Sequence, residues 1–490
     1  MNTIESVPKG KRNNGWFFAL LCLGVFVVYL DSTIVNVALP ELQRSFGIGM
    51  EGLQWVVDGY AIAFACLLLS AGTIGDIVGH KRVFTIGMIG FTVFSICCGL
   101  SETIEWLIVS RFLQGTFGAL LIPSSLAFIR HMYEDASARA RAIGIWAGLG
   151  GLALAVGPLA GGWLVEAFEW ESVFWINVPI GAVVVIVMLL ANRETVRNAK
   201  RKLDAPGQLL FIATIGTLAY ALIQGHSFGW GSYAIVGCFL TSGLLLVLFL
   251  LWESRVKEPL LPLQLFRIPA FAVACLVNFL GFFGFFAVVF LMTLYFQNVN
   301  GLSPMEAGVR FLSLNVSIML ASVIGSSLAS RVRPIVMIPA GLVIMGACLF
   351  WLMMIAPDTP YVQYVGALAG IGVGISFAGS SATVALMSSV PLQWAGTASG
   401  VSNTSRQVSA VLGVALSGTF VSERLRHSTA TMATGFKDSR VASLFTDGMY
   451  DTFLLAAIAC FFAAVVAFAL LASVARRQKQ AVVAAKAVEQ

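Results

Sequence analysis

The chain has 490 residues, of which 58% are hydrophobic and only 11% are charged, and its formal net charge is +6. A soluble protein with so few charges would precipitate, so the composition excludes a water-soluble globular domain. The basic residues form no patch interleaved with aromatic residues, and we therefore expect no nucleic-acid partner.

Apolar segments of about 20 residues recur along nearly the whole chain. Each is long enough, at about 1.5 Å rise per residue, to cross roughly 30 Å of hydrocarbon as a helix. The segments are continuous and do not alternate with polar residues, which excludes a transmembrane barrel. The sequence therefore predicts an all-α polytopic membrane protein. Its fourteen expected spans cover residues 16–38, 54–75, 82–101, 105–127, 142–165, 173–190, 207–225, 233–252, 271–296, 307–329, 335–355, 362–388, 396–421 and 452–474.

The first span is too long for the apolar core of a signal peptide, and no small-residue cleavage site follows it, so we expect it to be retained. Lys and Arg gather in the loops on one side of the spans, for example Lys81 and Arg82 after the second span and Arg476 and Arg477 after the last. The alternate loops are poor in these residues, apart from the long loop 422–451. Because Lys and Arg accumulate on the cytoplasmic side, both termini are expected in the cytoplasm.

The spans divide into six, two and six. Two short segments occupy corresponding positions of the six-span halves, GTIGDIVGHKR at 72–82 and GSSLASRVR at 325–333, and both place Gly before a basic end. This likeness suits two repeats that face each other across a central cavity, a common plan of secondary transporters, with two spans inserted between them. The expected units are an N-terminal six-helix bundle over 1–191, two inserted helices with cytoplasmic linkers over 192–268, a C-terminal six-helix bundle over 269–475 and a cytoplasmic tail over 476–490.

Four charged residues lie more than three residues from either end of a predicted span, namely Asp31, Asp58, Arg111 and Arg406, and the first three lie at similar depth. A charge near the middle of the bilayer costs about 2.5–3.5 kcal/mol on insertion scales, so such residues usually face the protein interior and act in function. No His lies in a predicted span, which leaves Asp as the candidate proton carrier. Structural interpretations stay open: Asp31 as a helix-packing partner, Asp58 as a solvated interfacial residue, and Arg111 as the neutraliser of a carboxylate.

Two groups of residues are candidates for lining a substrate cavity. Arg406 shares a helix face with Asn403 and Gln407, at i, i+3 and i+4 spacing, and this polar stripe either lines the cavity or clamps two helices. Phe282 and Phe286 belong to a Phe run of the ninth span that could hold lipophilic cations by cation–π attraction. Such a run also commonly faces lipid or packs against other helices.

The fifth span is rich in glycine. Its segment GIWAGLGGLALAVGPLAGG contains two pairs of glycines four residues apart, Gly144–Gly148 and Gly157–Gly161. Pairs with this spacing let neighbouring helix backbones approach closely, so we expect close packing at both. Pro158 removes one backbone hydrogen bond and permits a bend.

Seven segments together resemble a known family. They are LDSTIVNVALP at 30–40, GTIGDIVGHKR at 72–82, RFLQGTFGA at 111–119, GPLAGG at 157–162, WESVFWINVPIG at 170–181, LYFQNVNGLSPMEAGVR at 294–310 and GTASGVSNTSRQVSAVLGVA at 396–415. With the division into six, two and six spans, they are similar to the fourteen-span drug:proton antiporters of the major facilitator superfamily. The resemblance covers essentially the whole chain.

The second of these segments resembles the cytoplasmic loop motif of that superfamily, G-x-L-x-D-R-x-G-R-K/R. Ile77 and His80 stand where the pattern prefers Arg. The residues that fit the motif, and that the resemblance assigns to a cytoplasmic gate, are Gly72, Asp76, Gly79, Lys81 and Arg82.

The resemblance implies two six-helix bundles that rock around a central site, which opens alternately to each side. It implies that Asp31, buried without a permanent partner, exchanges a proton for a cationic drug, and that Arg111 tunes this exchange. Asp58 is the further candidate for proton coupling. Asp76 would latch the outward-facing state at a helix N-terminus of the other half, where a carboxylate gains about 0.3–1 kcal/mol. The antiporter motif of the fifth span would comprise Gly157, Pro158, Gly161 and Gly162.

The expected function is proton-coupled efflux of lipophilic, mainly cationic compounds across the cytoplasmic membrane of a bacterium, carried out by a monomer. No G-x-x-x-x-G-K-S/T phosphate loop appears, so we expect the proton gradient to drive transport without a cofactor. All eight Cys lie inside predicted spans, where Cys behaves as a small hydrophobe, so we expect no disulfide and no metal site.

An alternative keeps transport and changes the cargo to one endogenous metabolite, a self-made antibiotic or an imported nutrient. Competition among chemically unrelated cations would favour the multidrug interpretation, and saturable recognition of one compound would favour the alternative. An enzyme or a membrane scaffold is not expected. The sequence shows no nucleophile–base motif and no paired carboxylates in a recognisable cleft, and scaffolding explains intramembrane charges poorly.

Overall fold

The computed structural model describes residues 14–133, 135–190, 203–328, 332–391, 394–426 and 439–488. Within these ranges the chain is almost entirely helical and contains no β-strand. It has 14 helical segments that are long and apolar enough to cross a membrane. The all-α polytopic fold and the number of spans are therefore confirmed.

The first half of the chain contributes six spans. Their helices are α1 (Asn14–Phe46), α2 (Met50–Val78), α3 (His80–Gly99), α4 (Ile104–Met132), α5 (Ala136–Phe168), α6 (Ser172–Trp175) and α7 (Asn177–Leu190). Polar side chains cap two of them: Thr103 accepts a hydrogen bond from the N–H of Trp106 at the start of α4, and Asp135 accepts one from Ala138 at the start of α5. The predicted sixth span is divided at Ile176, so that the short α6 precedes α7.

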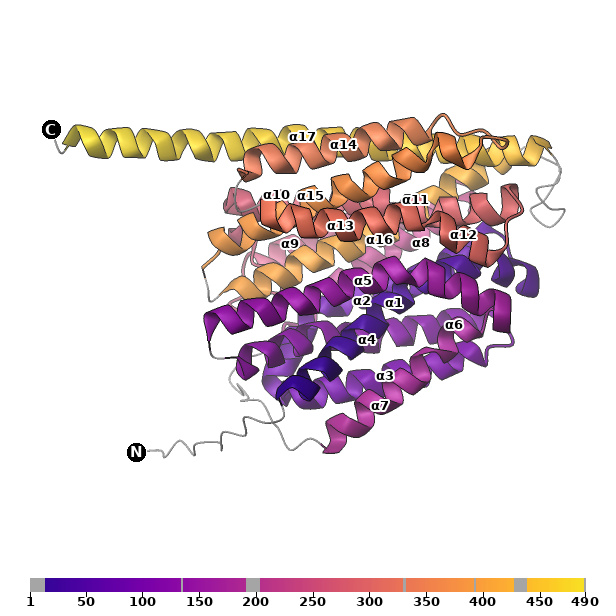
Figure 1. The fold of residues 1–490 in the computed structure, drawn as a ribbon, viewed down its shortest axis with the longest axis horizontal. Coiled ribbons are helices and arrows are strands. Elements are labelled where there is room, and N and C mark those ends of the chain that lie inside the picture. The colour runs from indigo at the N-terminus through magenta and orange to yellow at the C-terminus, as the bar shows by residue number, and fades with distance from the viewer. Residues whose placement is uncertain are drawn as a thin grey trace.

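Two inserted helices, α8 (Ala205–Phe228) and α9 (Tyr233–Glu253), separate the halves in sequence. α8 packs against α2 of the first half and α16 (Ala395–Leu425) of the second, whereas α9 packs mainly on α8. Figure 1 shows the pair behind the two halves. Leu240 and Leu244 of α9 are among its many exposed apolar side chains, as expected for a helix that faces lipid.

The second half contributes the remaining six spans. Its elements are η1 (Leu263–Arg267), α10 (Pro269–Leu276), η2 (Val277–Gly281), α11 (Phe282–Leu294), η3 (Tyr295–Val299), α12 (Pro304–Arg310), α13 (Leu312–Leu328), α14 (Pro334–Leu352), η4 (Tyr361–Gln363), α15 (Val365–Ser389), α16 and α17 (Ser439–Val488). The ninth span, from α10 to η3, contains π-helical turns at η2 and η3. Such turns are frequent at functional sites. The helix α17 continues to Val488, so the segment predicted as a tail is largely helical.

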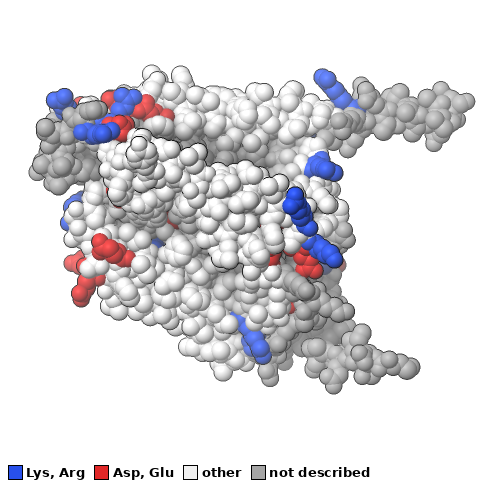
Figure 2. Space-filling view, turned by 180° about the vertical axis from the view of Figure 1, so that it is seen from behind, with Lys and Arg blue, Asp and Glu red and all other residues white. Residues whose placement is uncertain are grey.

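The two halves lie against each other with their helices running in a common direction (Figure 1). α1 begins and α17 ends on the same side of the bundle, which we call the terminal face, and the other end is the opposite face. Figure 2 shows Lys, Arg, Asp and Glu gathered toward the two ends of the visible surface, with a broad band of uncharged residues between them. This distribution is the one a multi-pass membrane protein requires.

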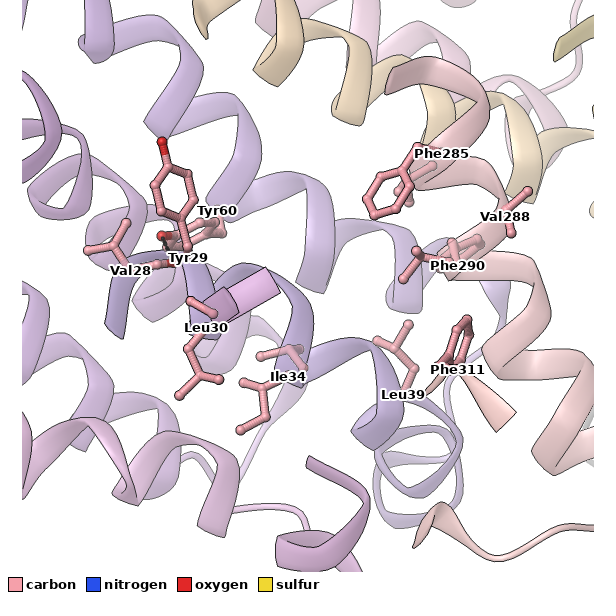
Figure 3. Packing of buried hydrophobic residues seen from close by; sticks show 14 of the residues in the cluster. Val28, Tyr29, Leu30, Ile34, Leu39, Tyr60, Phe285, Val288, Phe290 and Phe311 are labelled. Carbon is pink, nitrogen blue, oxygen red and sulfur yellow. Dashed lines mark hydrogen bonds between the residues drawn. The ribbon is translucent and has the colours of Figure 1, made fainter. Parts of the chain in front are cut away.

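Three sets of helix contacts join the halves. α1 packs against α11 and α12, α2 packs against α16, and α5 packs against α12 and α13. Figure 3 shows part of the first contact, where Leu39 of α1 lies beside Phe290 of α11 and Phe311, which follows α12. Between membrane-spanning helices, close van der Waals packing of this kind replaces the removal of side chains from water as the stabilising interaction, so this contact is a substantial part of the junction.

Hydrogen bonds reinforce these contacts toward the opposite face. Nε2 of Gln297 donates to the carbonyl of Val37 at 2.9 Å, and Nδ2 of Asn298 donates to Oε1 of Gln43 at 3.0 Å. The N–H of Met305 at the start of α12 donates to the carboxylate of Glu166 in α5 at 3.2 Å. The two halves are thus fastened together toward the opposite face.

Candidate functional site

Asp31 lies in a closed polar network inside the first half. Its side chain is fully buried, and Oδ2 accepts a hydrogen bond from Nη1 of Arg111 at 2.5 Å. Oδ1 accepts hydrogen bonds from Nε2 of Gln114 at 3.0 Å and from Nδ2 of Asn177 at 2.8 Å. Asn177 also donates to Oγ of Ser95 at 2.9 Å. Side chains from α4 and α7 therefore fix the carboxylate of α1 in one position.

Arg111 is buried beside Asp31 and is enclosed by aromatic rings. Its guanidinium carbon lies 4.2 Å from the ring centroid of Tyr60 and 5.7 Å from that of Phe174. Its Nε donates to the carbonyl of Val56 at 3.3 Å. Because aromatic faces attract a cation, most strongly when water is excluded, the rings stabilise the charge that Asp31 neutralises. The two residues form a satisfied buried ion pair with no net charge.

The structure corrects the expectation that Asp31 has no permanent partner. Arg111 neutralises the carboxylate, which is the structural interpretation that the sequence had left open for it. Gln114 was not predicted, although its i+3 spacing from Arg111 on α4 places both on one helix face. Asn177 lies in the family-like segment 170–181, but it was not predicted as a site residue, because α7 reaches Asp31 only in the folded bundle.

Asp58 of α2 is equally buried, but neither of its carboxyl oxygens has a hydrogen-bond partner in the described structure. Gln54, one turn earlier on the same face of α2, donates to the carbonyl of Ala415 in α16 at 2.6 Å. Ile62, one turn later, belongs to the same apolar cluster as Val411 of α16. Asp58 therefore lies on the face of α2 that packs against α16. The interpretation that it is solvated at the interface is wrong.

Arg406 of α16 connects the two halves. Its Nη2 donates to the hydroxyl of Tyr29 in α1 at 3.0 Å. Its guanidinium carbon lies 5.4 Å from the ring centroid of Tyr29 and 5.3 Å from that of Phe282 in α11. Arg406 is only partly buried, in contrast to the other three intramembrane charges. In the described part of the chain no carboxylate pairs with it, so it is the accessible charge at the junction of α1, α11 and α16.

The other predicted cavity residues have mixed surroundings. Asn403 is partly buried and donates to a backbone carbonyl of its own helix at 3.0 Å, whereas Gln407 is buried. Phe282 and Phe286 are both partly exposed, with ring centroids 6.2 Å apart. The structure thus brings Arg406 and Phe282 into contact, and it places Phe286 one turn farther along the same face of α11.

The glycines of the predicted antiporter motif lie where α5 crosses other helices. A Cβ atom on Gly161 would lie 2.8 Å from the carbonyl oxygen of Ile34 in α1, and Gly157 faces the same helix. A Cβ atom on Gly162 would lie 2.9 Å from the Cα of Met305 in α12. Only glycine permits these approaches. The motif therefore brings α5 against α1 and against the second half at the same level.

The remainder of α5 differs from the prediction. A Cβ atom on Gly144 or Gly148 would meet no atom within 4 Å, so the expected close packing at this pair is wrong. The bend-permitting Pro158 lies at the crossing with α12, where its carbonyl faces Gly308. One turn earlier in α5, the carbonyl of Ala155 accepts a hydrogen bond from Nδ2 of Asn315 at 2.6 Å. Of the two glycine pairs, only the one nearer the opposite face is closely packed.

The predicted gate motif ends α2 and begins α3 on the terminal face. Gly79 turns the chain between them with φ of 107°, a conformation that side chains disfavour. Oδ1 of Asp76 lies 3.0 Å from Nε2 of His80, so His80 contacts the acidic residue of the motif. Lys81 and Arg82 lie in the first turn of α3. Contact of Asp76 with a helix N-terminus of the other half stays a prediction.

Comparison with known proteins identifies relatives of this arrangement. The family model described as Major Facilitator Superfamily matches residues 21–414. The multidrug resistance protein Stp of Mycobacterium tuberculosis is 36% identical over 396 residues, which cover 81% of this chain and 74% of that protein. The methylenomycin A resistance protein of Streptomyces coelicolor is 34% identical, in an alignment that covers 84% of this chain and 87% of that protein. The tetracenomycin C resistance and export protein of Streptomyces glaucescens is also 34% identical, over 85% of this chain and 78% of that protein.

Solved structures share the fold. A bacterial homologue of the human lysosomal transporter Spinster, in an inward-facing and occupied conformation, matches with a TM-score of 0.66 and 15% identity. The match covers 94% of this chain and 97% of that structure. A peptide transporter in complex with sulfate matches with a TM-score of 0.66 and 14% identity, over 96% of this chain and 97% of that structure. At these identities the likeness concerns the fold alone.

Proposed function

The chain belongs to the major facilitator superfamily, among its drug-efflux transporters, and from this premise we propose that it exports lipophilic compounds in exchange for protons by alternating access. The chain is a transporter and not an enzyme. The observation that carries the proposal of proton coupling is the buried carboxyl group of Asp58, which has no hydrogen-bond partner among the described residues and lies on the face of α2 that packs against α16.

The orientation follows from charge. Lys81 and Arg82 lie at the terminal face, as does Arg476 near the end of α17. Because basic residues accumulate on the cytoplasmic side of membrane proteins, we place the terminal face and both termini in the cytoplasm. The fastened opposite face then lies outside, and the described conformation is closed toward the exterior.

Asp58 suits a proton carrier better than Asp31. An ionised carboxylate that is buried without a partner carries a desolvation cost of several kcal/mol, which the neutral acid avoids. The packed contact between α2 and α16 therefore requires Asp58 to hold a proton. Asp31 has no such requirement, because Arg111 and two amide donors satisfy its negative charge.

This difference couples protonation to the movement of the halves. When α2 and α16 separate at the exterior, water reaches Asp58 and the ionised form becomes tolerable. Proton uptake from the exterior then favours closure of that side and returns the carrier to the conformation open to the cytoplasm. Binding of the next cargo molecule from the cytoplasm loosens the contact between α2 and α16, so that water reaches Asp58 and its proton leaves to the cytoplasm before the exterior side opens. One cycle therefore exchanges cargo for a proton.

The cargo site is proposed at the junction around Arg406, Tyr29 and Phe282. Substrate sites of secondary transporters lie near the midplane between the repeated halves, and this junction lies between the two halves of this chain. Its aromatic rings suit lipophilic compounds. The expectation of mainly cationic cargo stays a prediction. Because the accessible positive charge of Arg406 repels other cations, anionic compounds should be tested beside cationic ones.

Proton flux in energised inside-out vesicles tests the proposal. Addition of a lipophilic compound should release protons from the vesicle interior, followed with an internal pH dye. Asp58→Asn should fold normally, because the amide replaces a neutral acid of the same shape, yet it should abolish cargo-triggered proton release. The matched control is Asp447→Asn, at an exposed position of α17, which should behave as wild type.

Two outcomes would contradict the proposal. Cargo-triggered proton release that persists in Asp58→Asn would remove this residue from the coupling path. Saturable exchange with one metabolite, and no response to chemically diverse compounds, would favour the alternative of a single-substrate exporter.

A further inference from the structure

Asp204 and Glu253 are two buried carboxyl groups at the ends of the inserted helices, on the terminal face. Asp204 precedes α8 and Glu253 is the last residue of α9, and their exposed fractions are 7% and 3%. Oδ1 of Asp204 accepts hydrogen bonds from the N–H of Gly207 at 3.0 Å and from Nε1 of Trp252 at 2.8 Å. Oε2 of Glu253 accepts one from the N–H of Leu261 at 2.9 Å. One oxygen of each carboxyl group is therefore satisfied.

The other two oxygens converge without a donor. Oδ2 of Asp204 and Oε1 of Glu253 are buried, and neither has a hydrogen-bond partner in the described structure. A methyl group added to Gly207 would touch both oxygens, which places them on the same side of that residue and close together. The structure thus contains two facing acceptors in a space closed to solvent.

Within the part of the chain that the structure describes, no cationic side chain compensates the charge of this pair. Asp204 is the charged group that acts on Glu253 among the described residues, and the linker after α9 supplies only backbone N–H groups to it. The side chains of Arg255 and Lys257 in that linker are exposed. The neighbouring helix α2 contributes Ser70, whose hydroxyl donates to the side chain of Gln208, and this hydrogen bond brings no charge to the carboxyl pair.

Two adjacent buried carboxylates cannot both be ionised without strong repulsion and a large desolvation cost. A single proton between them removes one charge and supplies a hydrogen bond to a charged acceptor, which is among the stronger kinds. A metal ion fits poorly, because Ca²⁺ takes about 6–8 oxygen ligands and Mg²⁺ requires near-octahedral coordination. We propose that Asp204 and Glu253 bind one shared proton, which clasps the beginning of α8 to the end of α9.

The clasp lies where the chain enters and leaves the inserted pair of helices. Loss of the shared proton at alkaline pH places two negative charges side by side and pushes the helix ends apart. The folded protein thus binds a proton here that the unfolded chain does not hold at neutral pH, so stability falls as the pH rises. This proton site is independent of the coupling proposed for Asp58, which lies between the halves.

Infrared spectroscopy of the purified full-length protein in lipid nanodiscs tests the clasp. Wild type at neutral pH should show the carbonyl band of a protonated carboxyl group that is lost in Glu253→Gln and in Asp204→Asn. Glu258→Gln, at an exposed position of the same linker, should retain the band. The use of two variants keeps the test informative if one of them folds poorly.

Thermal unfolding supplies a second readout. The unfolding temperature of wild type should fall between mildly acidic and alkaline pH, and Glu253→Gln should flatten this dependence because its amide donates to Asp204 at every pH. An unchanged infrared band in both variants, or the same pH dependence in Glu253→Gln as in wild type, would overturn the proposal. Destabilisation by a chelator that Ca²⁺ reverses would overturn it as well, in favour of a metal site.

Discussion

Replacement of Asp31 by Asn tests whether this residue is a structural ion-pair partner or a proton carrier. The substitution keeps the shape of the side chain, but it leaves the guanidinium of Arg111 buried at 2% exposure without its counter-charge. Removal of one partner of a buried ion pair typically costs about 3–5 kcal/mol. We therefore expect Asp31→Asn to lower stability by that order. The double variant Asp31→Asn/Arg111→Gln should recover most of the loss, because no unpaired charge then remains.

Unfolding of the purified proteins in the same detergent, compared among both single variants and the double variant, measures the coupling between the two residues. Asp447→Asn supplies the control for an Asp-to-Asn change at an exposed site. A loss below about 1 kcal/mol in Asp31→Asn, as for an exposed ion pair, would refute the reasoning. A double variant no more stable than the single variants would also refute it.

Two further predictions concern the junction of the halves. Gly162→Ala places a methyl group against α12, and overpacking of about 1–3 kcal/mol should disfavour the described conformation by roughly 5- to 150-fold and slow export at equal expression. Gly144→Ala, where a methyl group meets no atom within 4 Å, should leave export unchanged, and equal effects of the two would contradict this account. Arg406→Gln should weaken competition by a carboxylate-bearing compound about tenfold relative to an ammonium-bearing compound of similar shape, whereas Arg406→Lys should keep the wild-type preference. Vesicle uptake assays measure both variants. An unchanged preference in Arg406→Gln would show that the charge of this residue does not select the cargo.

The sequence by itself determined the architecture. Continuous apolar segments of membrane-spanning length have only one stable form in lipid, a helix, because every backbone polar group must be satisfied within the segment. The number of spans and the all-α fold followed from this constraint. The close crossing at Gly157 and Gly161 was likewise predictable, because small residues spaced by four on one helix face permit backbone approach. The same pattern at Gly144 and Gly148 led to a wrong prediction of close helix packing, because the spacing shows that an approach is possible and not that a neighbouring helix is present.

Only the tertiary structure decided which intramembrane charges have partners. Asp31 and Arg111 are 80 residues apart in the chain, and their similar depth in the membrane did not show that they touch. Asp58 gave the weaker signal in sequence, yet among the described intramembrane charges it is the carboxyl group with no hydrogen-bond partner, because the packing of α2 against α16 seals it from water. Depth along a helix can be counted from the sequence, whereas rotation about the helix axis and the choice of neighbour depend on how all fourteen spans pack together. The chemistry of each charge depends on that packing, because burial and hydrogen-bond partners decide whether an ionised group is stable.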